Sequence, residues 1–213
     1  MYEMKKFLLL FLMLSTTLFG QKVEHGVLAG ATLGFPMQDK KNSPVPPPSD
    51  FFLYQNNLYG GGKIGYRFRF MPAQKSFFDL DLTAGFQSLN FSKYKPNADG
   101  SDPNEGYAHF DKEDCNNFLL PIAVTGSWNY RFNEKFHAGL GVSPILYVQP
   151  HSAFDLSIMA KVGYRINKQI ELGFSYQYGC LNVMKHFNPA KSKGRKGHMS
   201  DLTVSVFIPF YIK

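Results

Sequence analysis

The sequence predicts an all-β protein: a transmembrane up-and-down antiparallel β-barrel of about eight strands, behind an N-terminal signal peptide. Three observations predict this fold. Large apolar residues alternate with polar or small residues over runs of about a dozen positions, which is typical of strands with two different faces. These runs exceed the roughly five or six residues usual for a strand. Short turns and long loops alternate between the runs, an asymmetry typical of barrels that span an outer membrane.

The segment 154–183 shows the alternation most clearly. Apolar side chains occupy every second position of residues 154–166, and charged residues, small residues and glycines occupy most of the positions between them. After the polar turn 167–169 the alternation resumes. A period of two on both sides of a short turn predicts an antiparallel hairpin, and one apolar face with one polar face is the pattern of a barrel wall in a membrane.

The remaining strands follow from the same alternation. They are expected at residues 23–35, 58–70, 78–91, 118–132, 136–148 and 201–212. The short turns are 71–77, 133–135 and 167–169, and the long connections, predicted as loops, are 36–56, 92–117 and 184–200. Pro121 and Pro144 lack the backbone donor that a strand ladder needs, so we expect local bulges at both positions.

Inward-facing charges are expected to pair across neighbouring strands. The register that joins the second and third strands places Arg69 opposite Asp79, and Arg67 opposite Asp81. In the last hairpin, Arg165 falls opposite Glu171. Opposite charges that face each other across strands are stabilising, and side chains can fill the interior of an eight-stranded barrel. We therefore interpret the charges as structural ion pairs in a filled lumen rather than an open pore, with a substrate site as the alternative. The predicted lumen residues are Lys63, Arg67, Arg69, Asp79, Asp81, Arg165 and Glu171.

Residues 1–20 have the features of a signal peptide. Lys5 and Lys6 precede an apolar run that is too short to span a membrane as a helix, and Gly20-Gln21 fits a cleavage point. The barrel domain is then 21–213. No later apolar run is long enough for a transmembrane helix, so a secreted β-sandwich is the competing interpretation. The high aromatic and glycine content favours the barrel.

The cysteines and the last long loop give two further expectations. Cys115 and Cys180 both fall on the long-loop side, where a secreted protein can form a disulfide; a bridge and two separate thiols are both open. The last loop carries five Lys and Arg residues, and phosphates of lipopolysaccharide or acidic glycans would be attracted to the last four of them, namely Lys191, Lys193, Arg195 and Lys196. Pairing with the acidic loop 92–117, or simple solvation, are the alternatives.

The sequence contains no convincing enzyme motif. His151 and Ser152 are adjacent, and neighbouring residues on a strand point to opposite faces, so they do not form a nucleophile and base there. No zinc pattern occurs. We expect no cofactor, no metal, no nucleic-acid partner and no enzyme activity. The alternative is an outer-leaflet, lipid A-modifying enzyme, deacylase-like, on an eight-stranded barrel.

Several stretches resemble a known family. GVLAGATLGF in the first strand, NNFLLPIAV entering the fourth, FHAGLGVSPILY in the fifth and FDLSIMAKVGYRINKQIELGFSYQYGCLNV in the last hairpin are similar to small outer-membrane β-barrel domain proteins of Bacteroidota-type bacteria, called porin-like or PorT-like. The resemblance covers essentially residues 21–213, although the chain ends on Lys213 rather than on an aromatic residue.

This resemblance implies a fold and a location more than a function. It implies a monomer in the bacterial outer membrane, placed there by the barrel-insertion machinery and surrounded by outer-membrane lipid and lipopolysaccharide. The expected role is structural or one of surface interaction, and no specific protein partner follows.

Overall fold

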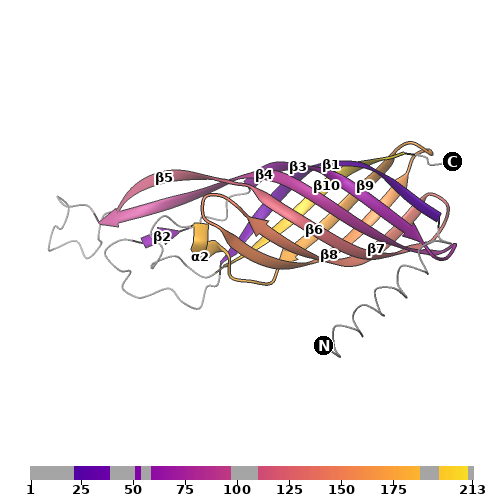
Figure 1. Ribbon diagram of the computed structural model, residues 1–213. Helices are drawn as coiled ribbons and strands as arrows, with labels where there is room; N and C mark the ends of the chain where they lie inside the picture. The colour runs from indigo at the N-terminus through magenta and orange to yellow at the C-terminus, as the bar shows by residue number, and fades with distance from the viewer. Residues whose placement is uncertain (1–21, 39–50, 54–58, 97–109, 188–196, 211–213) are drawn as a thin grey trace, which may run out of the picture.

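A computed structural model describes residues 22–38, 51–53, 59–96, 110–187 and 197–210, with the backbone alone at 38, 51–53, 90–96 and 110–115. Eight antiparallel strands form a closed ring (Figure 1). They are β1 (Lys22–Gln38), β3 (Tyr59–Met71), β4 (Ser76–Pro96), β6 (Pro121–Arg131), β7 (Phe136–Tyr147), β8 (Ala153–Arg165), β9 (Glu171–Gly179) and β10 (Gly197–Phe210). Pairing of β1 with β10 and of β4 with β6 closes the ring. The predicted antiparallel barrel is confirmed.

Short side-chain-capped turns set the register of two hairpins. Between β6 and β7, Asn133 Oδ1 accepts the backbone N–H groups of Lys135 and Phe136 at 2.9 and 2.7 Å. Between β8 and β9, Asn167 Oδ1 accepts those of Gln169 and Ile170, both at 2.8 Å. An asparagine that bonds to the backbone two and three residues later stabilises a tight turn. Both turns lie where the sequence predicts them.

The wall of the barrel is apolar outside and polar inside. Leu140, Ile64 and Phe132 expose 70%, 63% and 60% of their surface, and most outward positions carry large hydrophobic residues. Among the described residues, buried polar and charged side chains outnumber buried hydrophobic ones. Soluble monomeric proteins rarely expose an apolar surface of this extent to water. A closed barrel suits lipid instead, because it pairs its backbone donors and acceptors internally. No helix among the described residues is long and apolar enough to span a membrane.

The predicted loop 92–117 is wrong at both of its ends. β4 continues to Pro96, and β5 (Phe110–Leu119) pairs with it from Gln87↔Leu119 to Pro96↔Phe110. The two strands form a hairpin that projects beyond the ring (Figure 1). Its register places Lys93 opposite Glu113 and Lys95 opposite Asp111. The charged composition that suggests a loop therefore belongs to two paired strands, whose register sets opposite charges in cross-strand positions.

The other long connections also contain short elements. β1 extends to Gln38, and β2 (Phe51–Leu53) pairs with β4 beside the projecting hairpin. The predicted loop 184–200 begins with the helical turn α2 (Met184–Phe187), and β10 starts at Gly197.

The predicted bulges at the two prolines are also wrong. Around Pro144 the β6–β7 ladder is interrupted, but the register is the same on both sides: Ala123 pairs with Ile145 and Gly126 with Val142. At Pro121 the break separates β5 from β6, which continue along β4 in one register. A missing donor therefore interrupts the hydrogen bonding without inserting a residue.

Candidate functional site in the barrel lumen

Two arginine–aspartate pairs on adjacent strands begin the lumen network at the short-turn end. Arg67 on β3 donates from Nε and Nη2 to the two carboxylate oxygens of Asp81 on β4, at 2.7 and 2.8 Å. Arg69 donates in the same way to Asp79, at 2.7 and 3.1 Å. All four side chains are buried. The register predicted from the sequence is confirmed, and two-pronged geometry is the strong form of the arginine–carboxylate contact.

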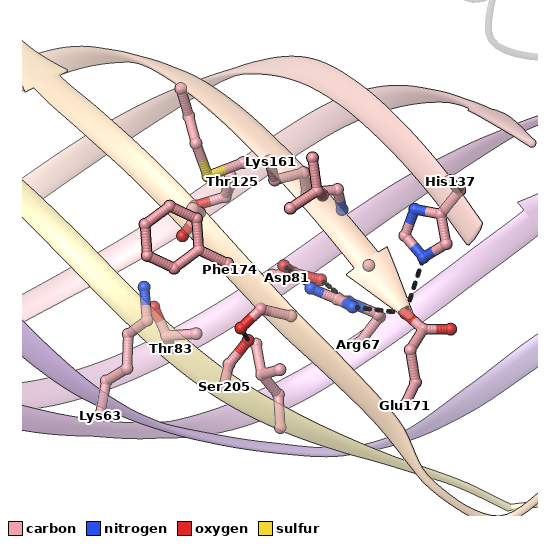
Figure 2. A pocket seen from close by; sticks show the side chains of 16 residues that line it. Lys63, Arg67, Asp81, Thr83, Thr125, His137, Lys161, Glu171, Phe174 and Ser205 are labelled. Carbon is pink, nitrogen blue, oxygen red and sulfur yellow. Dashed lines mark hydrogen bonds and ion pairs between the residues drawn. The ribbon is translucent and has the colours of Figure 1, made fainter. Parts of the chain in front are cut away.

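Glu171 on β9 is the centre of the network. Its carboxylate accepts two bonds from Arg69, at 2.6 and 2.7 Å, and one from Arg165 Nη2 at 2.9 Å. His137 Nε2 lies 3.1 Å from its Oε1. The predicted Arg165–Glu171 match is confirmed. Since Arg69 contacts both Asp79 on β4 and Glu171 on β9, the network joins strands that are not neighbours and crosses the lumen (Figure 2 shows the part around Arg67, Glu171 and His137).

Two charged residues that are absent from the predicted set complete this layer. Glu24 on β1 accepts two bonds from Arg165, both at 2.7 Å, and Lys161 on β8 donates to Asp79 at 2.6 Å. The ion pairs then join four cations (Arg67, Arg69, Lys161, Arg165) and four carboxylates (Glu24, Asp79, Asp81, Glu171). Such a balance limits the cost of burying charge.

Inward aromatic rings pack against the same arginines. The Cζ atom of Arg69 lies 4.3 Å from the centre of the Phe77 ring, and Arg67 Cζ lies 5.1 Å from that of Phe207. A guanidinium over a ring face gains from the electron density of the ring. Rings and ion pairs together fill the short-turn end of the barrel.

Lys63 lies on the long-loop side of the ion-pair layer and takes no part in the ion pairs that the described residues form. The prediction that Lys63 belongs to a lumen ion pair is therefore wrong. It lines both of two small polar cavities, of about 30 and about 40 Å³, together with Thr83 and Thr125. In Figure 2 it stands apart from the hydrogen-bonded residues around Glu171. Spaces of this size suit a few water molecules.

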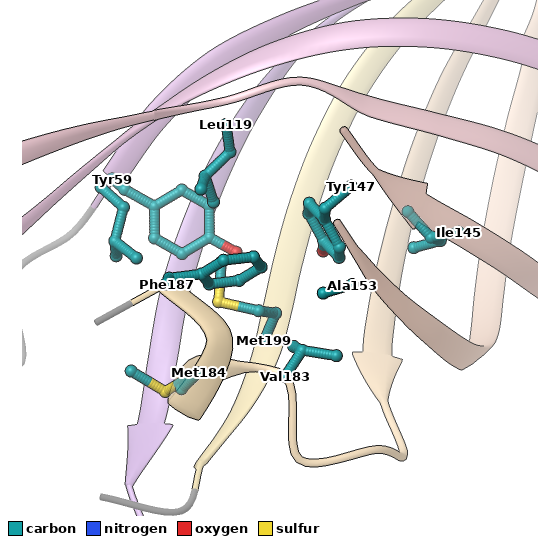
Figure 3. Close-up of a cluster of buried hydrophobic side chains, with 10 residues drawn as sticks. Tyr59, Leu119, Ile145, Tyr147, Ala153, Val183, Met184, Phe187 and Met199 are labelled. Carbon is teal, nitrogen blue, oxygen red and sulfur yellow. The ribbon is translucent and has the colours of Figure 1, made fainter. Parts of the chain in front are cut away.

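A hydrophobic cluster closes the long-loop end from inside. Met184 and Phe187 of α2 are fully buried against Tyr59, Tyr147 and neighbouring apolar side chains (Figure 3). The rings of Phe187 and Tyr147 meet edge to face, with centres 5.0 Å apart, and Asn117 Nδ2 donates to the carbonyl of Phe187. Large inward-facing apolar residues at this end of the strands are therefore lumen residues that cover the mouth of the barrel.

One glycine is required by this plug. The phenol of Tyr59 donates to Asp201 and its ring lies over Gly34 of β1. A Cβ atom at Gly34 would come within 1.8 Å of that ring. Only glycine leaves room for the ring at this point of the wall.

The closed ring, its lipid-facing wall and its polar interior decide the location, because open sheet edges and exposed backbone do not occur in lipid. The protein is an integral outer-membrane β-barrel. No family model matches the chain, and no curated protein matches it.

Three solved structures to which the chain is similar are outer-membrane barrels. Ail, the attachment invasion locus protein of Yersinia pestis, has 12% sequence identity and a TM-score of 0.45, over 89% of this chain and 99% of its own. Neisserial surface protein A has 12% identity and a TM-score of 0.44, over 89% and 99%. The outer membrane protease OmpT from Escherichia coli has 9% identity and a TM-score of 0.41, over 89% and 96%.

Several predicted residues fall beyond what the structure describes. Residues 1–20, the predicted signal peptide, and the basic residues Lys191, Lys193, Arg195 and Lys196 lie outside the described residues. Cys180 directly follows β9 and is exposed. The side chain of Cys115 is not described, so the disulfide stays a prediction. His151 and Ser152 lie in the connection between β7 and β8. Among the described residues, no cluster of His, Cys, Asp or Glu suits a metal ion.

Proposed function

We propose that the protein is a non-conducting outer-membrane barrel that presents the β4–β5 hairpin and its long loops at the cell surface, in a structural or surface-interaction role and not as an enzyme. The observation that carries the proposal is the double closure of the lumen. Ion pairs fill the short-turn end around Glu171, and the cluster around Phe187 fills the long-loop end. We also propose membership of the porin-like family of Bacteroidota-type bacteria on the sequence stretches quoted above.

The projecting hairpin supports a role in surface interaction. Among the described residues β5 pairs only with β4, so its other edge offers a row of backbone donors and acceptors to an extended segment of a partner. β5 itself carries three acidic residues and one basic residue, and a strand added to its free edge would be their direct cross-strand neighbour, with Lys93 and Lys95 of β4 one strand farther away. Two copies of such an acidic strand repel each other, whereas a basic segment is attracted. The preferred partner is therefore an extended basic peptide segment.

Conductance tests the closed lumen. The purified protein in planar lipid bilayers should give no steady current steps, because neither end offers an ion a path. The matched control is a double variant, Glu171→Ala with Phe187→Ala, which lacks the central residue of each plug. It is used only if it keeps the heat-modifiable migration of a folded barrel. Steady pores from the unmodified protein would overturn the proposal.

Two peptides of equal charge test the interaction edge. A decapeptide of alternating Val and Lys can add to β5 through its backbone, whereas the same sequence with every backbone nitrogen methylated has the same charge and no backbone donor on either edge. Surface plasmon resonance should detect saturable binding of the first peptide only. Replacing residues 91–115 by a two-residue turn between Asn90 and Asn116, which are paired, should abolish it. Equal binding of both peptides would show that binding depends on peptide charge alone, and would refute strand addition.

Lipid A chemistry separates this proposal from the enzyme alternative. Mass spectra of lipid A from a strain that lacks the protein should equal those from the parent strain. A changed acylation pattern would replace the interaction role by an enzymatic one.

A further inference from the structure

The outer wall of the barrel carries a large apolar groove. Its volume is about 1020 Å³, more than twice that of the second outer groove at about 430 Å³. Small outward-facing residues, Ala31, Gly62 and Ala84, form its floor, and larger side chains such as Ile64, Phe86 and Val204 form its sides. The last three expose 63%, 51% and 58% of their surface. The hollow exists because small residues on three adjacent strands lie between large ones.

Strand register fixes the course of the groove. Val204 pairs with Ala31, Ala31 with Gly62 and Gly62 with Phe86, so the floor follows one row of neighbours across the strands. The row starts near the middle of β10 and ends beside Leu120, where Val148 donates to the carbonyl of Leu120 at 2.9 Å at the long-loop rim. Because strands tilt by roughly 35–45° in such barrels, the row climbs obliquely from mid-wall to that rim.

The groove therefore lies in the half of the wall that faces the outer leaflet, since long loops face outside. The smaller groove lies nearer the other leaflet. It is lined by Trp128, Ala138 and Leu140, and Ala138 is two residues from the start of β7 at the short turn. The two hollows thus face different lipids.

We propose that the larger groove binds one acyl chain of lipid A from the outer leaflet. The lining is hydrophobic, it is continuous with the lipid-facing wall, and it opens at the rim where the sugar phosphates of lipid A reside. An acyl chain that lies over Gly62 removes more apolar surface from contact with mobile lipid than a chain on a convex part of the wall. The site holds a lipid in one place and one orientation beside the projecting hairpin.

Native mass spectrometry of the whole protein in maltoside detergent tests the site. Purified lipid A is the probe, and dioleoyl phosphatidylethanolamine at equal concentration is the comparison lipid. The unmodified protein should retain one lipid A per barrel in preference to the phospholipid. Ala31→Leu fills the floor and should weaken retention at least tenfold. Ala160→Leu makes the same change in the smaller groove and should leave retention unchanged.

Heat-modifiable migration identifies folded variants before they are compared. If Ala31→Leu does not fold, Ala84→Leu fills the same floor from β4 and is measured instead. Equal retention by the floor variant and the unmodified protein would overturn the proposal. Equal retention of lipid A and the phospholipid would also overturn it. A protein dimer in the spectra that the floor variant abolishes would overturn it too, because the occupant of the groove would then be a second copy of the protein.

Discussion

Replacing Glu171 by Gln should destabilise the barrel by about 3 kcal/mol. The carboxylate is 2% exposed and contacts Arg69, Arg165 and His137. Glutamine keeps the shape of the side chain but removes the charge, so the layer would hold four cations and three carboxylates. Removing one partner of a buried ion pair costs about 3–5 kcal/mol.

The lower end of that range applies because neither arginine loses all of its partners. Arg69 keeps its contacts with Asp79, at 2.7 and 3.1 Å. Arg165 keeps both of its 2.7 Å bonds to Glu24. A double variant that also changes Arg165 to Gln restores the balance of charge. It should therefore lose less stability than the sum of the two single variants, by roughly 0.5–3 kcal/mol.

Urea unfolding in lipid vesicles measures the effect, with extrapolation to zero denaturant. The chain has one tryptophan, Trp128, which lies on the lipid-facing wall and is 58% exposed, so its fluorescence reports departure from lipid. Glu134→Gln, in the exposed turn before β7, is the matched control and should change stability by no more than about 0.5 kcal/mol. A loss below about 1 kcal/mol for the Glu171 variant would show that the network does not hold the lumen together.

Three further perturbations test the wall and the outer plug. Gly34→Ala pushes a Cβ atom into the ring of the plug tyrosine and should cost about 1–3 kcal/mol, whereas Gly60→Ala meets nothing within 4 Å and should be nearly neutral in the same urea assay. Leu82→Arg at mid-wall should cost about 2–4 kcal/mol of stability in vesicles, and Val148→Arg at the rim about 0–1 kcal/mol. Equal costs for the two variants would show that the membrane is not centred on Leu82. Phe187→Ala should cost about 3–5 kcal/mol yet leave single-channel recordings silent, and current steps from this single variant would show that the ion-pair layer does not seal the lumen.

The wall could be predicted from the sequence because lipid imposes one simple rule. Each outward position must be apolar, so a period of two runs through every strand and marks its length. Turn length and opposite charges then fix the register of neighbours, which is why Arg67 with Asp81 and Arg165 with Glu171 were predicted correctly.

The interior could be predicted only in part, because register relates neighbouring strands alone. Arg69 on β3 and Glu171 on β9 are far apart in sheet order, and only the closed ring brings them together. Lys63 shares the inward face with the arginines but lies higher, beside threonines and cavities. The helical turn α2 has four residues, too few to show a helical period, so its role as a plug was not visible.

The different chemistry of the two plugs determines what the lumen can do. The ion-pair layer belongs to side chains of β1, β3, β4, β8 and β9, so it cannot open without breaking contacts among five of the eight strands. The outer plug depends on one helical turn, held by apolar contacts and by the bond from Asn117 to Phe187. Displacement of α2 would therefore create a blind pocket that ends at the ion pairs rather than a channel. A ligand that reached the lumen would enter and leave from the cell surface, on the side where β4 and β5 project.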